Sequence, residues 1–425
     1  MAAVKEAAIL VEGPAGGVVW APSMVETVGR GVGLAMRAMA APLIAGARWG
    51  DGRALRTLRG VAQSRASWTV GLKAAFDEVF FLTEVVAGAP LAFLETPRLT
   101  EEAARALEQF DERGWLARPE TYHRTPPPLV SPDVEATVAV PGLSYEYVSF
   151  ASEYDPWPGE IGRERWLAYE ANRTAHARVF RHRGAPRPWV VCVPGYRMGG
   201  IAVDIVGFQV GWLYGTLGLN VAIPVLPFHG PRRVGRRTGD GYITGDFIDT
   251  IHAQAQTLWD IRRLLAWVRA QEAPAVGVYG VSLGGYTTAM LASLDADLDC
   301  AVAGMPPACF ARLMRDNSPA IVNRLTEYAG FPWKAVETLL RVVSPLALTP
   351  QVPVERRFLF AGIADSLAPR SQAMALWRHW GRPRLAWYPG SHSSFMLEPA
   401  VRGLLREAFR CGGLVADDER AVRVA

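Results

Sequence analysis

The chain has 425 residues, half of them hydrophobic and 20% charged, so it can bury a sizeable core in one or two domains, and its composition argues against disorder. Its 45 basic and 41 acidic residues leave a formal net charge of +4, which is too balanced to indicate a nucleic-acid partner. The N-terminus lacks a secretory-signal pattern and no uncharged apolar run reaches about eighteen residues, so we expect a cytoplasmic protein without a membrane span.

Residues 1–125 predict a helical accessory region. Apolar residues recur at helical spacing from Ser23, a second helical pattern covers Trp68 to Leu94, and Thr100 is a candidate N-cap of a third helix. Between residues 27 and 75, seven arginines and Lys73 face Asp51 alone, a surplus of seven positive charges. This surplus is typical of a solvated helix face, and it also fits an amphipathic surface that contacts an anionic membrane.

Prolines predict a stiff linker over residues 126–144, before a main domain at residues 145–412 and a tail at residues 413–425. Two alternating segments indicate antiparallel strands, and six apolar runs separated by helical patterns indicate buried parallel strands. The alternating segments are Tyr145–Ala151 and Ala175–Arg181, and the apolar runs are Trp189–Val193, Asn220–Leu226, Val276–Val281, Cys300–Ala303, Arg357–Ile363 and Arg384–Tyr388. The pattern predicts an α/β fold, a mostly parallel sheet covered by helices, with a helical insertion at residues 305–350.

The segment from Ala275 to Met290, AVGVYGVSLGGYTTAM, contains the pattern G-x-S-x-G around Ser282. A β-branched, apolar run precedes the serine and a helical pattern follows it. Gly280 and Gly284 permit the sharp turn that presents a serine hydroxyl between a strand and a helix. The segment therefore predicts a nucleophile elbow.

Over about residues 145–412, this order of strands and loops resembles the α/β-hydrolase superfamily, and more loosely its esterase and lipase members. The resemblance implies a catalytic acid after a late strand and a catalytic histidine after the last one. Asp365, in AGIADSLAP, and His392, in GSHSSF, stand at those two places. Histidine can accept the serine proton near neutral pH, and an aspartate can orient the imidazole and stabilise its charged form.

The oxyanion of such a reaction needs two preset donors. The backbone N–H of Leu283, directly after the serine, is one, and the resemblance implies a second in the loop after Val193, with Tyr196 as first choice and Arg197 as second. The sequence departs from the family here, because the common His-Gly is replaced by Pro194-Gly195. The departure leaves the identity of the second donor open.

The loop PFHGPRRVGRRTGD follows the next strand and contains His229, Arg232 and Arg233. These side chains are candidate substrate-binding groups, because arginine forks bind carboxylates and phosphates. A solvated loop, or arginines paired with Asp240 and Asp246, is the alternative. We expect no cofactor and no metal. The cysteines Cys192, Cys300, Cys309 and Cys411 form no C-x-x-C pair and are interpreted as buried free thiols.

These patterns favour a serine hydrolase that cleaves small-molecule or lipid carboxylic esters through an acyl-enzyme. Amide cleavage, as in a peptidase, and acyl transfer use the same triad and remain alternatives. A non-catalytic α/β-hydrolase scaffold is a further alternative, and so is a peripheral membrane protein whose function lies in residues 23–94. The oligomeric state is not predicted.

Overall fold

The computed structural model describes residues 11–12, 18–19, 96–140, 143–243, 246–318 and 320–416. The chain divides into two compact units, Met1–Gln63 and Ser64–Ala425. In the first unit, β1 (Val11–Glu12) and β2 (Val18–Val19) pair in antiparallel orientation. The predicted helices from Ser23 and over residues 68–94, and the basic surplus, lie outside the described residues.

The second unit is built around a sheet whose nine described strands follow the order β11-β10-β9-β8-β6-β7-β5-β4-β3. Strands β6 to β11 pair in parallel, whereas β3, β4 and β5 form an antiparallel side that joins the rest through β7. The strands are β3 (Asp133–Val140), β4 (Leu143–Ala151), β5 (Thr174–Phe180), β6 (Trp189–Val193), β7 (Asn220–Val225), β8 (Val276–Val281), β9 (Cys300–Gly304), β10 (Arg357–Gly362) and β11 (Arg384–Tyr388). The mostly parallel α/β fold predicted from the sequence is confirmed.

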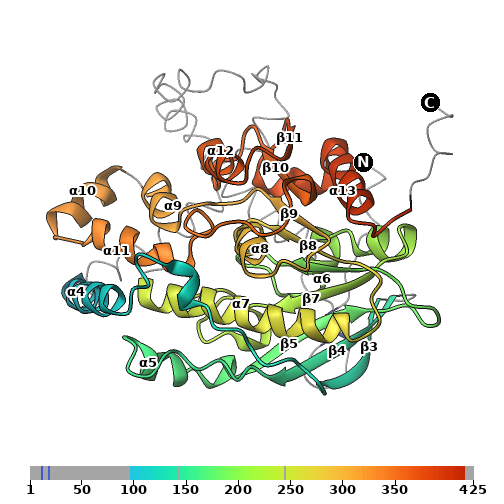
Figure 1. Cartoon of the computed structure of the whole chain (residues 1–425), viewed down its shortest axis with the longest axis horizontal. Coiled ribbons are helices and arrows are strands. Elements are labelled where there is room, and N and C mark those ends of the chain that lie inside the picture. Colours follow the sequence, from blue (N-terminus) through green and yellow to red (C-terminus); the bar gives the residue numbers. More distant parts are fainter. Residues whose placement is uncertain are drawn as a thin grey trace. The chain divides into compact units, whose positions relative to one another are not determined.

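Both faces of the central strands β6 to β9 are buried, and β6 shows why. Trp189, Val191 and Val193 point into one apolar cluster, and the alternate residues Val190 and Cys192 point into another. Helices α7 (Phe247–Arg269) and α8 (Leu283–Leu294) supply the first cluster, and α13 (Pro399–Cys411) supplies the second. In Figure 1, α7 crosses in front of the strands. An unbroken apolar strand is therefore the expected sequence here.

The remaining α-helices are α4 (Thr96–Glu112), α5 (Arg163–Leu167), α6 (Ile201–Gly207), α9 (Phe310–Asn317), α10 (Ala320–Tyr328), α11 (Trp333–Leu339) and α12 (Arg370–His379). Leu376 of α12 belongs to the first apolar cluster, and Ile201 and Ile205 of α6 pack against the second. In Figure 1, α9, α10 and α11 group together beside α4, at the end of α7. The 3-10 helices are η2 (Pro119–Tyr122), η3 (Glu170–Asn172), η5 (Gly230–Arg232), η6 (Leu340–Val343), η7 (Val354–Arg356) and η8 (His392–Leu397), and η4 (Gly211–Thr216) is a short π-helix. No helix among the described residues is long and apolar enough to cross a membrane.

Three local predictions are corrected. The predicted linker at residues 126–144 contains β3, which pairs with β4 at the sheet edge, because its alternating side chains suit a half-exposed strand. Thr100 is not a cap: α4 begins at Thr96, and the Thr100 hydroxyl donates to the Thr96 carbonyl, 2.8 Å away. All four cysteines are free, but Cys411 is exposed and Cys309 is partly exposed.

Candidate active site

Ser282 occupies a strained turn between β8 and α8. Its backbone angles are φ 57° and ψ −118°, a conformation that L-residues rarely adopt. A Cβ atom at Gly280 would lie 2.0 Å from the Gly284 carbonyl oxygen, and one at Gly284 would lie 1.8 Å from the Val193 carbonyl oxygen. Neither position can hold a side chain, so the geometry of the predicted elbow accounts for both glycines.

His392 and Asp365 are in direct contact. The Nδ1 atom of His392 lies 2.7 Å from Asp365 Oδ2. The Asp365 side chain is 1% exposed and that of His392 is 14% exposed. The other Asp365 oxygen accepts hydrogen bonds from the backbone N–H groups of Leu367 at 3.0 Å and Ala368 at 2.8 Å. The backbone of the loop after β10 therefore holds one oxygen of the carboxylate, while the other oxygen contacts the imidazole.

The loop that presents His392 is fastened to the neighbouring loop and to itself. The Ala364 N–H donates to the Gly390 carbonyl at 3.0 Å, which ties the loop after β10 to the loop after β11. The buried Tyr388 hydroxyl donates to the Ser391 carbonyl at 3.0 Å, and the Ser391 N–H donates to Ser394 Oγ at 3.1 Å. These bonds bracket His392, which begins η8.

The loop after β6, residues Pro194–Gly200, lies against the Ser282 turn. We call it the oxyanion loop, after the donor that the sequence analysis predicts in it. A Cβ atom at Gly195 would lie 3.3 Å from Ser282 Cβ, so the two backbones are in close contact. The loop carries Tyr196 and Arg197, the first and second choices for the second oxyanion donor. Leu283 is the first residue of α8, and N–H groups in the first turn of a helix have no intrahelical acceptor. The loop thus lies beside Ser282, where the sequence analysis predicts the second donor.

The oxyanion loop is bonded to the loop that follows β7. Thr238 Oγ1 donates to the Met198 carbonyl at 2.9 Å, and Arg197 Nη1 donates to the Thr238 carbonyl at 2.7 Å. Arg197 also forms an ion pair with Asp240 at 2.5 Å, and its guanidinium lies 4.5 Å from the centre of the Tyr196 ring. The Arg197 side chain is therefore occupied by protein partners.

No family model matches the chain. It is 42% identical over 320 residues to the uncharacterized protein MT2702 of Mycobacterium tuberculosis strain CDC 1551 / Oshkosh, and 41% identical over the same length to the uncharacterized protein Rv2627c of strain H37Rv. Each alignment covers 75% of this chain and 76% of the relative. The chain belongs to the same family as these two proteins.

Solved structures with a similar fold include three esterases. Acetyl xylan esterase 1 from Thermoanaerobacterium is 17% identical, with a TM-score of 0.47 and coverage of 67% of this chain and 89% of that one. An acetyl xylan esterase from Paenibacillus is 16% identical, with a TM-score of 0.46 and coverage of 65% and 94%. A cold-adapted esterase from an Arctic intertidal metagenomic library is 16% identical, with a TM-score of 0.42 and coverage of 68% and 100%.

Two of the predicted substrate-binding residues lie in the core of the protein. Arg232 is fully buried, pairs with Asp260 at 2.9 Å, and donates to the carbonyls of Val225 and Asn172. His229 is also fully buried, its Nδ1 lies 2.8 Å from the Pro227 carbonyl, and burial lowers its pKa to about 4. Both predictions are corrected, because the two side chains are buried and bond to groups inside the protein. Arg233, by contrast, is exposed.

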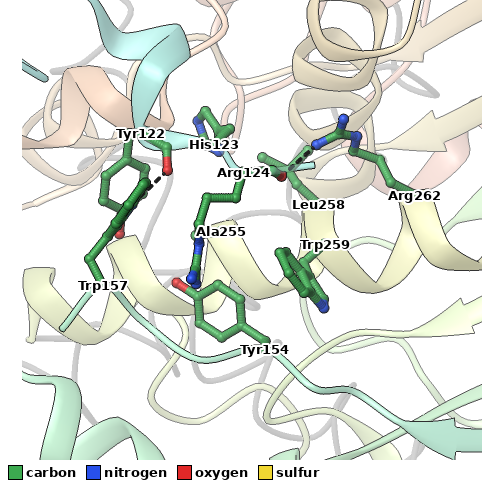
Figure 2. A pocket seen from close by; sticks show the side chains of 9 residues that line it. All are labelled: Tyr122, His123, Arg124, Tyr154, Trp157, Ala255, Leu258, Trp259 and Arg262. Atoms are coloured by element: carbon green, nitrogen blue, oxygen red, sulfur yellow. Dashed lines mark hydrogen bonds between the residues drawn. The ribbon is translucent and has the colours of Figure 1, made fainter. Parts of the chain in front are cut away.

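One described hollow lies outside the loops that hold Ser282, Asp365 and His392. Figure 2 shows it between the segment before β3 and the outer face of α7. The Arg124 guanidinium fills the space, 4.9 Å from the Trp157 ring and 5.4 Å from the Trp259 ring. Arg262 donates to the Arg124 carbonyl at 2.9 Å, and the remaining volume is about 20 Å³. This volume suits a water molecule and is too small for an ester substrate.

The sequence interpretation missed the buried ion pair of Arg178 on β5 with Asp204 on α6, and it missed Thr238. A signal was present, since Arg178 interrupts an apolar stretch of β5 and Asp204 stands among apolar residues of α6. A charge in such a place needs a buried partner. The partner could not be named, because the two residues come together only in the folded protein.

Proposed function

We propose that this protein is a serine hydrolase of carboxylic esters that forms an acyl-enzyme on Ser282. The 2.7 Å contact between His392 Nδ1 and Asp365 Oδ2, on loops that follow the same edge of the sheet as the strained Ser282 turn, supports this proposal most directly. Ends of parallel strands meet at one edge of an open α/β sheet, where ligands bind.

The proposed reaction follows from the protonation states that the contact requires. A carboxylate can only accept, so His392 donates its Nδ1–H to Asp365 and keeps Nε2 free of a proton. Nε2 then takes the Ser282 proton as the hydroxyl oxygen attacks the ester carbonyl carbon. The imidazolium returns this proton to the departing alcohol, and a water molecule repeats the sequence to release the acid.

The negative charge on the substrate oxygen is assigned to two backbone donors, the N–H of Leu283 and the N–H of Tyr196. A helix begins at Leu283, so its N–H also carries the favourable dipole of the helix N-terminus. The Gly195 contact with Ser282 supports the choice of the oxyanion loop for the second donor. Loss of one such donor typically costs about 10² to 10³ in kcat.

Covalent labelling tests the proposal. The purified protein is treated with a fluorophosphonate probe, and mass spectrometry identifies the modified residue. We expect label on Ser282, no label on the Ser282→Ala variant, and slow labelling of His392→Ala. Ser293→Ala is the matched control, because this serine lies buried on α8, the helix that follows Ser282, and its loss should not affect labelling. A folded protein that takes no label would favour the non-catalytic scaffold.

Steady-state kinetics then separates the reaction types. An ester series from acetate to long-chain p-nitrophenyl esters is compared with the matching p-nitroanilides, and with esters in the presence of an alcohol acceptor. Hydrolysis of esters that greatly exceeds the other two rates is the expected result. Faster anilide cleavage or preferential transfer to the alcohol would reassign the activity to an amidase or an acyltransferase.

A further inference from the structure

A buried ion pair lies directly behind the oxyanion loop. Arg178 on β5 and Asp204 on α6 are 2.8 Å apart, and their side chains are 8% and 0% exposed. Burial raises the pKa of Asp204 to about 6, against the opposing effect of the Arg178 charge. The Arg178 guanidinium, 2.8 Å away, stabilises the ionised form of this carboxylate.

The same two side chains hold both polar backbone groups of Gly199. The second guanidinium nitrogen of Arg178 donates to the Gly199 carbonyl at 2.9 Å, and the Gly199 N–H donates to Asp204 Oδ1 at 3.0 Å. Gly199 has φ +100°, and a Cβ there would lie 3.1 Å from His229 Cβ and 3.3 Å from the Gly230 nitrogen. The ion pair thus holds Gly199 of the oxyanion loop against His229 and Gly230 of the loop after β7.

A contribution to stability alone does not account for this arrangement well. Buried ion pairs are often no more stabilising than apolar residues of the same size, because both charges lose their hydration. Here the remaining hydrogen-bonding capacity of both charges is directed at a loop that touches Ser282 through Gly195. A geometric role for the pair explains where its hydrogen bonds go.

We propose that Arg178 and Asp204 are positioning residues, which hold Gly199 and thereby keep the Tyr196 N–H where the oxyanion of the reaction forms. The inference rests on the proposed hydrolase function. Neither side chain needs to touch substrate, so their removal should weaken transition-state binding more than substrate binding.

The test is the Asp204→Asn variant, which keeps the size of the side chain and an acceptor for the Gly199 N–H but removes the charge that holds Arg178. With a p-nitrophenyl ester we expect kcat to fall by about 10- to 100-fold, with KM changed less than about twofold. The affinity of a trifluoromethyl ketone, which forms a tetrahedral adduct with the serine, should fall in parallel with kcat.

The matched control is Asp260→Asn. Asp260 forms another buried pair, with Arg232, whose hydrogen bonds go to Val225 and Asn172 and not to the oxyanion loop. This variant should lose stability while the kcat and inhibitor affinity of its folded fraction stay at the wild-type values. Unchanged kcat and inhibitor affinity in folded Asp204→Asn, or the same selective loss in both variants, would overturn the inference.

Hydrogen exchange separates a failure of this inference from a failure of the proposed function. If wild-type protein neither hydrolyses esters nor takes the fluorophosphonate label, the function fails and the kinetic test does not apply. The proposed restraint of Gly199 by Arg178 and Asp204 is then tested by hydrogen exchange in peptides that cover Tyr196 to Gly199. Exchange about tenfold faster than wild type in Asp204→Asn, with exchange at the wild-type rate in Asp260→Asn, supports the restraint. Equal exchange in wild type and Asp204→Asn contradicts it.

Discussion

His392 Nδ1 lies 2.7 Å from a carboxylate oxygen of Asp365 that is almost completely buried. The carboxylate is itself held by two backbone N–H groups, so its position does not depend on the histidine. A neutral amide at this position would favour the wrong imidazole tautomer, with a proton on the nitrogen that must act as base.

Asp365→Asn should therefore lower kcat by up to about 10⁴-fold, with little change in KM, because substrate binding does not require the carboxylate. Steady-state kinetics on a p-nitrophenyl ester measures both constants. The control is Asp297→Asn, an exposed aspartate on the turn after α8, which should leave both constants unchanged. Full activity of Asp365→Asn would mean that another acid serves His392.

Gly284 leaves no room for a methyl group, since a Cβ atom would lie 1.8 Å from the Val193 carbonyl oxygen. The obstacle is backbone of the central strand β6, which cannot move aside cheaply. We expect Gly284→Ala to lose more than about 3 kcal/mol of unfolding free energy or to fail to fold. Gly403→Ala, on α13 with nothing within 4 Å, should instead gain up to about 1 kcal/mol. Urea unfolding of both variants measures the difference.

Local patterns were sufficient to place Ser282, Asp365 and His392 on loops that follow strands. Ser282 comes directly after β8, Asp365 comes three positions after β10, and His392 comes four positions after β11. The structure brings Asp365 and His392 into contact. Local patterns were not sufficient for Arg232 or β3. The burial of Arg232 depends on Asp260, 28 positions away, and β3 exists only because β4 pairs with it. Long-range pairing overrides the local preference of arginines and prolines for surface loops.

Arg232 should behave as a core residue and not as a substrate ligand. Arg232→Met would leave Asp260 buried without its partner, and loss of one member of a buried pair typically costs about 3 to 5 kcal/mol. Arg233→Met, one position on and exposed, should change stability by less than about 0.5 kcal/mol. Denaturant unfolding compares the two. A stable Arg232→Met variant with selectively weaker binding of anionic esters would restore the original prediction.

His229 should make stability depend on pH. Burial lowers its folded-state pKa to about 4, whereas the unfolded chain takes up the proton near 6.5. Between these values the unfolded state binds more protons, so stability is complete above pH 6.5 and falls as pH drops, by at most about 1.4 kcal/mol per pH unit. His229→Asn removes this contribution. Urea unfolding from pH 7 to 4.5 should show a shallower decline for the variant, and parallel curves would contradict the assignment.

Gly239 connects packing behind the oxyanion loop to activity. It has φ +87°, and a Cβ atom there would lie 2.8 Å from His229 Nε2 and 2.9 Å from a carbon of the Tyr196 ring. Gly239→Ala should therefore cost stability and also displace Tyr196, whose N–H is the candidate second donor, so that kcat falls at least about tenfold.

The matched control is Gly184→Ala, at φ +101° with nothing within 4 Å, which should cost about 1 to 2 kcal/mol for the backbone conformation alone and leave kcat unchanged. Urea unfolding and ester kinetics on both variants separate the two effects. If Gly239→Ala loses stability but retains full kcat, the Tyr196 ring does not set the position of its N–H, and Arg197 becomes the preferred donor.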